Sequence, residues 1–200
     1  MAEDSEFARR DFRLYLVTNF SRRHLREFEG WPLSSISQAL GKSAIDTLCD
    51  LLREERLDLA YVGLGGNPVN IRRFFQHPAH MVASDALFVG PQLNPRSYGC
   101  FPFVLGDLCR EEGVLDLSEA IRKMTSLPAQ RLGLSDRGLL RDGRKADIVV
   151  FDAQRVKSQA TLEHPRQFPE GIEYVIVNGV VVFADGAHTG ARPGRALRLA

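Results

Sequence analysis

The sequence predicts an α/β protein whose last third is made of β-strands. In the first two thirds, short apolar runs alternate with helical segments, an order that is typical of a parallel sheet. Near the end, the apolar runs 173–178 (EYVIVN) and 180–184 (VVVFA) meet at Asn178-Gly179, and an Asn-Gly pair between two such runs predicts a type I′ hairpin.

The first predicted strand is the short apolar run at residues 14–18 (LYLVT). The clearest helix follows at residues 43–56, where Ser43 and Asp46 form a helix start signal: a capping hydroxyl with an acidic side chain three residues later. The expected apolar face of this helix consists of Ile45, Leu48, Cys49 and Leu52, which makes Cys49 a core residue in this interpretation.

A second strand is expected at residues 59–64 (LAYVGL), followed by a helix that begins at Asn67-Pro68. The short apolar run at residues 80–84 (HMVAS) is a third strand candidate. Residues 90–99 are rich in Gly, Pro and Asn and predict a loop.

Further helices are predicted from Pro102 and from Ser118, and residues 126–145 have the Gly, Arg and Asp content of a connector. A strand is then expected at residues 146–151 (ADIVVF). The change in composition and predicted secondary structure places a domain boundary in the connector. The predicted domains are residues 1–127 and residues 128–200.

Composition excludes several classes of protein. The chain has 200 residues, 44% of them hydrophobic, with 26 Lys+Arg against 25 Asp+Glu, which is ordinary for a globular protein. A net charge of +1 gives no electrostatic case for nucleic-acid binding. No apolar run is long enough to span a membrane, and the charged start MAEDSEFARRDF lacks the core of a secretion signal. Three widely spaced cysteines fit no disulfide framework, so we expect a cytoplasmic protein.

Two polar residues, Asp85 and Arg96, are candidates for a catalytic or binding site. Asp85 directly follows the apolar run 80–84, and a carboxylate at the end of a buried strand can bind a metal ion or accept a proton from water; the alternative is a loop cap. Arg96 lies in the following loop, and its guanidinium can hold a carboxylate through two parallel hydrogen bonds, unless it is a surface residue. Tyr98 lines a pocket or covers the core.

The histidines do not form a metal-binding pattern. His77 and His80 are separated by Pro78, which breaks a helix between them, and neither H-x-H nor H-E-x-x-H occurs. The glycines at 63, 65 and 66 lack the spacing of a dinucleotide fingerprint.

Several segments together resemble a known family: MVASDALFVG, NPRSYGCFPFVLG, LSEAIRKMTSLPAQRLGL, RGLLRDGRKADIVVFD and GIEYVIVNGVVVFADGAHTGARPGR. Their order and spacing are similar to the carboxy-terminal part of D-aminoacylases, the N-acyl-D-amino-acid deacylases of the amidohydrolase superfamily. The resemblance runs from about residue 20 to the end of the chain. It implies the last part of a TIM-type (β/α) barrel, followed by strands of a small β-sandwich domain.

The resemblance also implies a function. The family hydrolyses N-acyl-D-amino acids to a D-amino acid and a carboxylate with zinc. Asp85 matches the family's general base, with a weak or water-mediated metal contact, and Arg96 matches the residue that holds the substrate carboxylate, with Tyr98 beside it. The expected partners are this small substrate and the missing amino-terminal part of the enzyme, or a second copy of the chain.

The departures from the family matter as well. The H-x-H motif, a metal-binding Cys and two further metal-binding His of the family have no counterpart in this chain, Asn94 stands where His is common, and Cys100 replaces a usual Thr. We therefore expect a chain that is inactive alone and holds no zinc by itself. The alternatives are a non-catalytic remnant or association module, and a dihydroorotase- or hydantoinase-like enzyme.

Overall fold

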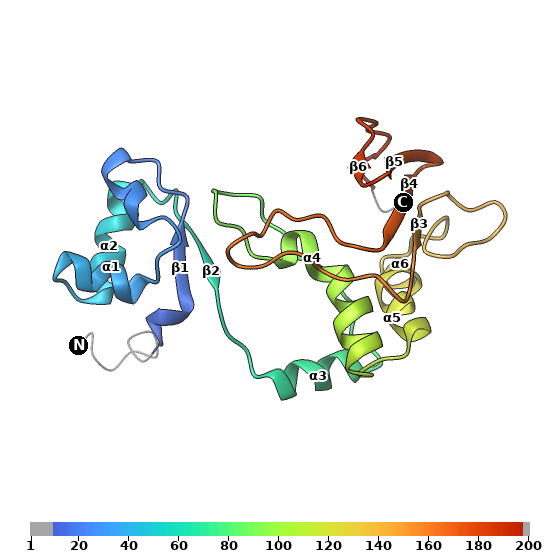
Figure 1. Cartoon of the computed structure of the whole chain (residues 1–200), viewed down its shortest axis with the longest axis horizontal. Helices are drawn as coiled ribbons and strands as arrows, with labels where there is room; N and C mark the ends of the chain where they lie inside the picture. Colours follow the sequence, from blue (N-terminus) through green and yellow to red (C-terminus); the bar gives the residue numbers. More distant parts are fainter. Residues whose placement is uncertain (1–9, 198–200) are drawn as a thin grey trace. The chain divides into compact units, whose positions relative to one another are not determined.

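The computed structural model describes residues 10–197, so most of the charged start lies outside the described residues. The chain forms two compact units, which Figure 1 traces from blue to red. Unit 1 comprises the residues up to 67 together with 86–94, and unit 2 comprises residues 68–85 together with those from 95 onward. No helix within residues 10–197 is long and apolar enough to cross a bilayer. The predicted domain boundary after residue 127 stays a prediction.

Unit 1 combines one small sheet with short helices. In chain order its elements are the 3-10 helix η1 (Phe12–Leu14), strand β1 (Tyr15–Thr18), the 3-10 helix η2 (Arg23–Phe28), helix α1 (Leu33–Leu40), helix α2 (Ala44–Glu54) and strand β2 (Ala60–Gly63).

Strands β1 and β2 confirm the two predicted strands but not their direction. They pair antiparallel, with Tyr15 opposite Gly63 and Thr18 opposite Ala60. The prediction of a parallel sheet is wrong for this pair. Alternation of strands and helices along a sequence does not fix which strand ends lie together, and here the connection through α1 and α2 returns the chain antiparallel.

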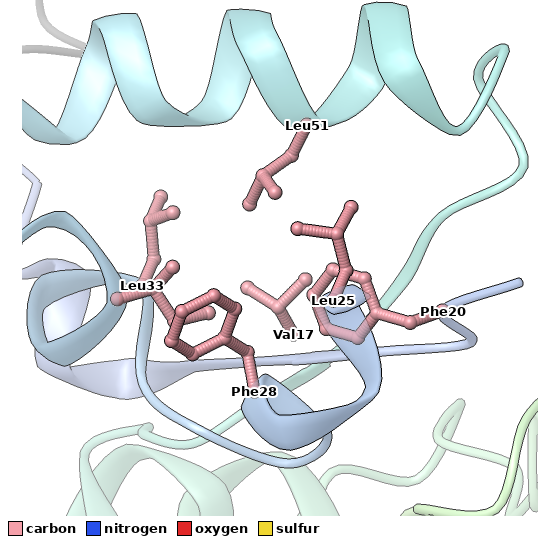
Figure 2. Packing of buried hydrophobic residues seen from close by; sticks show 7 residues of the cluster. Val17, Phe20, Leu25, Phe28, Leu33 and Leu51 are labelled. Atoms are coloured by element: carbon pink, nitrogen blue, oxygen red, sulfur yellow. The ribbon is translucent and has the colours of Figure 1, made fainter. Parts of the chain in front are cut away.

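The core of unit 1 lies between β1 and α2. Figure 2 shows its side chains pointing toward one another below α2. The buried residues of this cluster are Val17, Phe20, Leu25, Phe28, Leu33, Ile36 and Leu51. Burying each large apolar side chain contributes about 1.5–3 kcal/mol, so this cluster is the main source of stability for unit 1.

Helix α2 begins as predicted but buries a different face. The Ser43 hydroxyl accepts the Asp46 N–H at 3.1 Å, which confirms the start signal. Cys49, however, is exposed, and the prediction that it belongs to the core is wrong. The buried residues of α2 are Thr47 and Leu51, with Leu48 packed at the edge of the core. Apolar residues at 45, 48, 49 and 52 share a helical side, but the packed stripe lies nearer 44, 47, 48 and 51.

Two glutamates hold the turn that follows β1. The Glu29 carboxylate accepts the N–H groups of Asn19 and Phe20 at 3.0 and 3.2 Å. The Glu55 carboxylate accepts the N–H groups of Ser21 and Arg22, each at 3.0 Å, and the Ser21 hydroxyl. The turn has no regular secondary structure to pair these donors, so the two carboxylates pair them instead.

The described part of unit 2 contains five helical elements followed by an antiparallel sheet. Its helices are α3 (Pro68–Gln76), α4 (Arg96–Phe103), the π-helix η3 (Val104–Glu111), α5 (Leu117–Met124) and α6 (Ser126–Arg131). Its strands are β3 (Ile148–Phe151), β4 (Ile172–Val177), β5 (Val180–Ala184) and β6 (Ala187–His188), in that spatial order.

Two helix boundaries differ from the sequence prediction. Helix α4 begins at Arg96, inside the predicted loop, rather than at Pro102. Pro95 precedes its first residue with a φ of −52°, and proline at a helix start removes an N–H that would otherwise lack a partner. Helix α6 occupies the first residues of the predicted connector, although glycine and charged residues dominate the rest of that stretch.

Two glycines let the continuous helix α4–η3 pack closely against the extended segment near residue 156. A Cβ added at Gly106 would lie 2.5 Å from the Val156 carbonyl oxygen, and one added at Gly99 would lie 2.1 Å from the Ser158 hydroxyl. Val156 is fully buried and belongs to the core of unit 2, which also contains Val82. The remaining buried residues of this core are Val104, Leu105, Leu108, Leu115 and Ala120.

The predicted hairpin is confirmed. Strands β4 and β5 pair antiparallel across a loop of Asn178 and Gly179, whose φ angles of 48° and 80° are both positive, as a type I′ turn requires. Asp185 and Gly186 also have positive φ angles, 52° and 75°, and join β5 to β6. Within the described residues the sheets have two and four strands, and a closed barrel is not formed.

Candidate active site

The segment that leads to Asp85 has no regular secondary structure. The prediction of a strand at residues 80–84 is therefore wrong, because the segment has no neighbouring strand among the described residues. Val82 nevertheless buries its side chain in the core of unit 2. Its N–H donates to the carbonyl oxygen of Lys123 at 3.1 Å. The Ala83 carbonyl lies 3.5 Å from the thiol of Cys100 on α4.

Asp85 and Arg96, which the sequence singles out, are brought together in unit 2. The Arg96 Nη2 atom lies 3.0 Å from the Asp85 carboxylate, and Nη2 and Nε lie 3.3 and 3.4 Å from the Asp85 carbonyl oxygen. Asp85 has a φ of 47°, an uncommon conformation for a residue with a side chain, and its side chain is 83% exposed. The Arg96 side chain is 46% exposed. The pair is therefore open to a ligand.

Arg96 lies in the first turn of α4, where the helix dipole disfavours a positive charge. The carboxylate and carbonyl of Asp85 offset this effect. Because exposed ion pairs contribute little to stability, the guanidinium can exchange Asp85 for another carboxylate at small cost.

The Tyr98 ring packs against Phe168, which in turn packs against the sheet. The Tyr98 ring lies 6.0 Å from the Phe168 ring, which lies 5.5 Å from Phe183 on β5. This row of aromatic rings supports the interpretation of Tyr98 as a residue that covers the core; its role in substrate binding stays a prediction.

The two cysteines of the helix α4–η3 are not activated nucleophiles. Burial raises the pKa of the Cys100 thiol, and the positive charge of Arg96 only partly opposes this effect. Burial also raises the pKa of Cys109, and Asp116 acts in the same direction. Both thiols thus remain protonated at neutral pH, whereas a nucleophilic cysteine needs a lowered pKa.

A zinc ion needs about three converging protein ligands. Across residues 10–197, His, Cys, Asp and Glu side chains form no group of three or more that could hold a metal. The centroids of the His80 and Phe75 rings lie 4.6 Å apart with the rings tilted by 51°, and the His77 Nδ1 atom accepts the Ala79 N–H at 3.2 Å. The described side chains do not fit a complete zinc site, and Asp85 could supply no more than one ligand.

Three residues that the sequence did not single out surround the start of this segment. Lys123, Arg122 and Glu119 lie on α5 and face the turn at residues 77–80. Their spacing of three and four residues on a helix places them on one face, which is the signal that could have found them.

Neighbouring charged groups shift the pKa values of Glu119 on this face of α5 and of His80 in the turn that it faces. Two hydrogen bonds from Arg122, at 2.7 and 2.8 Å, hold the pKa of Glu119 at about 2, with Lys123 acting in the same direction. Burial lowers the pKa of His80, and the charge of Lys123 lowers it further. At neutral pH, Glu119 is therefore ionised and His80 is neutral.

Comparison with known proteins gives a consistent result. The model of a family described as "Amidohydrolase family" matches residues 52–183. N-acyl-D-glutamate deacylase from Alcaligenes xylosoxydans xylosoxydans is 43% identical over 165 residues, which are 80% of this chain and 33% of that protein. N-acyl-D-aspartate deacylase from the same organism is 38% identical over 184 residues, 88% of this chain and 36% of that protein. The chain thus spans about a third of the length of these curated relatives.

Solved structures agree with the sequence relatives. A crystal structure of D-aminoacylase matches with a TM-score of 0.81 and 34% identity, over 88% of this chain and 36% of that one. The zinc-bound N-acyl-D-glutamate deacylase of Bordetella bronchiseptica, in complex with a phosphonate inhibitor, matches with a TM-score of 0.80 and 33% identity, over 94% of this chain and 38% of that one. A dihydroorotase from Endomicrobium trichonymphae matches over only 36% of this chain. The resemblance to D-aminoacylases inferred from the sequence is confirmed.

Proposed function

Because the chain belongs to the amidohydrolase family, we propose that it supplies the carboxy-terminal part of a zinc-dependent hydrolase that cleaves N-acyl-D-amino acids. The products are a D-amino acid and a carboxylate. The observation that carries the proposal is the Asp85–Arg96 pair, in which a carboxylate and a guanidinium lie 3.0 Å apart and open to a ligand. Hydrolysis of an N-acyl-amino acid needs a base near the amide and a positive charge near the substrate carboxylate, and Asp85 and Arg96 would provide them.

The two residues have separate tasks in the proposed reaction. Asp85 accepts a proton from the water that attacks the amide carbonyl, as general base. Arg96 holds the carboxylate of the substrate through parallel hydrogen bonds. When that carboxylate binds, it replaces the carboxylate of Asp85 at the guanidinium. The base is then released in the same event that positions the substrate.

Zinc dependence of the complete enzyme is part of the proposal, with support from the zinc-bound relative. Residues 10–197 contain no group of three or more His, Cys, Asp or Glu side chains that could hold a metal, so they do not supply the ligand set alone. The described residues provide the base and the carboxylate anchor, and most of the metal ligands must be supplied by another segment.

Exposed apolar side chains support pairing with further polypeptide of the same enzyme. Val149 and Val150 on β3, 51% and 40% exposed, point to opposite faces of the sheet because successive strand residues alternate. Strand β3 is also at the edge of the sheet. An open edge with apolar residues on both faces favours association with another strand, from the same enzyme or from a second copy.

The proposed function is tested by joining this chain to the part of a relative that it does not span. We would fuse this chain to the amino-terminal two thirds of the 43% identical N-acyl-D-glutamate deacylase and assay N-acetyl-D-glutamate, N-acetyl-D-aspartate and their L enantiomers. We expect the fusion to release a D-amino acid only when it carries Asp85. We also expect the fusion to bind zinc, and the isolated chain to hold less than one zinc per molecule. A correctly folded, zinc-loaded fusion without deacylase activity would favour the non-catalytic remnant. Hydrolysis of dihydroorotate instead would favour the cyclic-amide alternative.

A further inference from the structure

Lys123 is the largest fully buried side chain of the described residues, and it is charged. Lysine is almost never fully buried without partners, because removing an ammonium from water is costly. The proposed reaction does not use this residue.

The partners of Lys123 account for each of its three donors. The ammonium donates to the carbonyl oxygens of His77 and His80, the latter at 3.3 Å, and lies 3.5 Å from the Glu119 carboxylate. An ammonium group has three N–H donors and no acceptor, so these three oxygens complete its hydrogen bonding. Two of the three belong to the backbone of the segment that leads to Asp85.

The backbone of Lys123 holds the same segment. Its carbonyl oxygen accepts the N–H of Val82. Arg122, fixed by Glu119, adds a donor 3.3 Å from the Pro78 carbonyl oxygen. The end of α5 therefore binds the segment at residues 77, 78, 80 and 82, where a neighbouring strand would otherwise pair the backbone.

We propose that Lys123 is a positioning residue, which fixes the point from which Asp85 enters the active site. We call the bonds from Lys123 and Arg122 to residues 77–82 the clamp. The inference rests on the proposed function for the role of Asp85, but not for the existence of the clamp. Asp85 follows Val82 by three residues, and its other end is held by Arg96 on α4. A fixed segment places the carboxylate of Asp85 at one position relative to Arg96. Without Lys123, the His80 carbonyl loses this donor and the His77 carbonyl keeps only the His80 N–H, so the segment opens.

The first test uses the isolated chain and amide hydrogen exchange measured by NMR. Lys123→Met keeps the length and apolar stem of the side chain but removes the donors. We expect the amides of His80 and Val82 to exchange at least 10-fold faster, while the amides of the β4–β5 hairpin change less than 2-fold. Lys157→Met is the matched control, since Lys157 also lies near a glutamate but is 48% exposed. The control should leave all these rates unchanged.

Two results would overturn the clamp. Unchanged exchange at Val82 would show that the lysine does not hold the segment, and a uniform increase across unit 2 would make Lys123 an ordinary core residue. If Lys123→Met does not fold, Arg122→Gln decides the question. Arg122 has a side chain that is 39% exposed, so its loss should spare the fold, and it should raise exchange at His80 by at least 3-fold. No change there would also refute the clamp.

The second test uses the active fusion enzyme. Lys123→Met should lower kcat per folded molecule at least 10-fold and leave KM within 2-fold, because Arg96 is anchored on α4 and still binds the substrate carboxylate. A purely structural lysine would change the amount of folded enzyme and leave kcat per folded molecule unchanged, which would refute the positioning role. If the unmodified fusion is inactive, the proposed function fails while the exchange experiment still decides the clamp.

Discussion

Replacement of Glu55 by glutamine should destabilise unit 1. Glu55 is 3% exposed, and its carboxylate accepts two backbone N–H groups and the Ser21 hydroxyl. Hydrogen bonds to a charged acceptor contribute about 1.5–3 kcal/mol each. In the variant one oxygen becomes an NH2 group that faces N–H donors, so at least one bond is lost and the others become neutral. Allowing for the lower cost of burying an amide, we expect a loss of about 2–4 kcal/mol.

The assay can follow unit 1 alone. Trp31 is the only tryptophan of the chain, it lies in unit 1, and its ring packs against Phe28 at 5.5 Å. Its fluorescence in urea therefore reports the unfolding of this unit. A loss of 3 kcal/mol with an m value of about 1.5 kcal/mol/M lowers the midpoint by about 2 M. Glu54→Gln is the matched control, because the Glu54 side chain is 43% exposed and should change the midpoint little.

The dependence on pH provides a second measurement on the same residue. Burial raises the pKa of Glu55, but the hydrogen bonds from Ser21 and Arg22 outweigh it and hold the pKa below its ordinary value. A lowered folded-state pKa means that the unfolded chain binds the proton more readily. The stabilisation is thus complete above about pH 4.3, the ordinary pKa of glutamate, and is lost as the pH falls through the lower folded-state value. A Glu55→Gln chain with the stability and acid sensitivity of Glu54→Gln would refute this account of the turn.

Four further predictions concern unit 2. Gly106→Ala places a Cβ 2.5 Å from the Val156 carbonyl oxygen and should cost about 1–3 kcal/mol in thermal denaturation, whereas Gly194→Ala, in open space, should cost almost nothing. Gly179→Val forces a β-branched residue to a φ of 80°; it should weaken the hairpin by about 1–2 kcal/mol and reduce the β4–β5 cross-strand contacts seen by NMR. In the fusion enzyme, Asp85→Asn should lower kcat at least ~10²-fold, and near-normal kcat would remove Asp85 as the base. Arg96→Ala should mainly raise KM, and unchanged kinetics would remove only its role as anchor.

Local chemistry made parts of the fold predictable. The Asn178-Gly179 hairpin and the Ser43 helix cap each depend on residues within one turn, and both are confirmed. Asp85 and Arg96 could be associated because they are only 11 residues apart, and the structure brings them together. Their catalytic and binding roles stay predictions, since these roles depend on groups beyond the described residues.

Features set by tertiary packing could not be predicted. The antiparallel direction of β1 and β2 depends on how the intervening helices fold back, which a strand pattern does not encode. The exposure of Cys49 depends on which side of α2 meets the core, and a helix with several apolar residues offers more than one such side. The burial of Lys123 could not be predicted for the same reason, because a lysine in a helix is normally exposed and only packing against its neighbours buries it.

The failed strand prediction at residues 80–84 and the buried lysine have one physical cause. An apolar run predicts that side chains are buried, and Val82 is buried as expected. Burial also obliges the backbone to find partners, and a strand usually finds them on its neighbour. Here α5 provides them instead, through the Lys123 ammonium, which pairs the carbonyl groups of His77 and His80, and through the Lys123 carbonyl, which accepts the N–H of Val82. The energetic cost of burying the ammonium is therefore offset by its bonds to these two carbonyl groups and by the nearby Glu119 carboxylate, and the segment that carries Asp85 is held without a sheet.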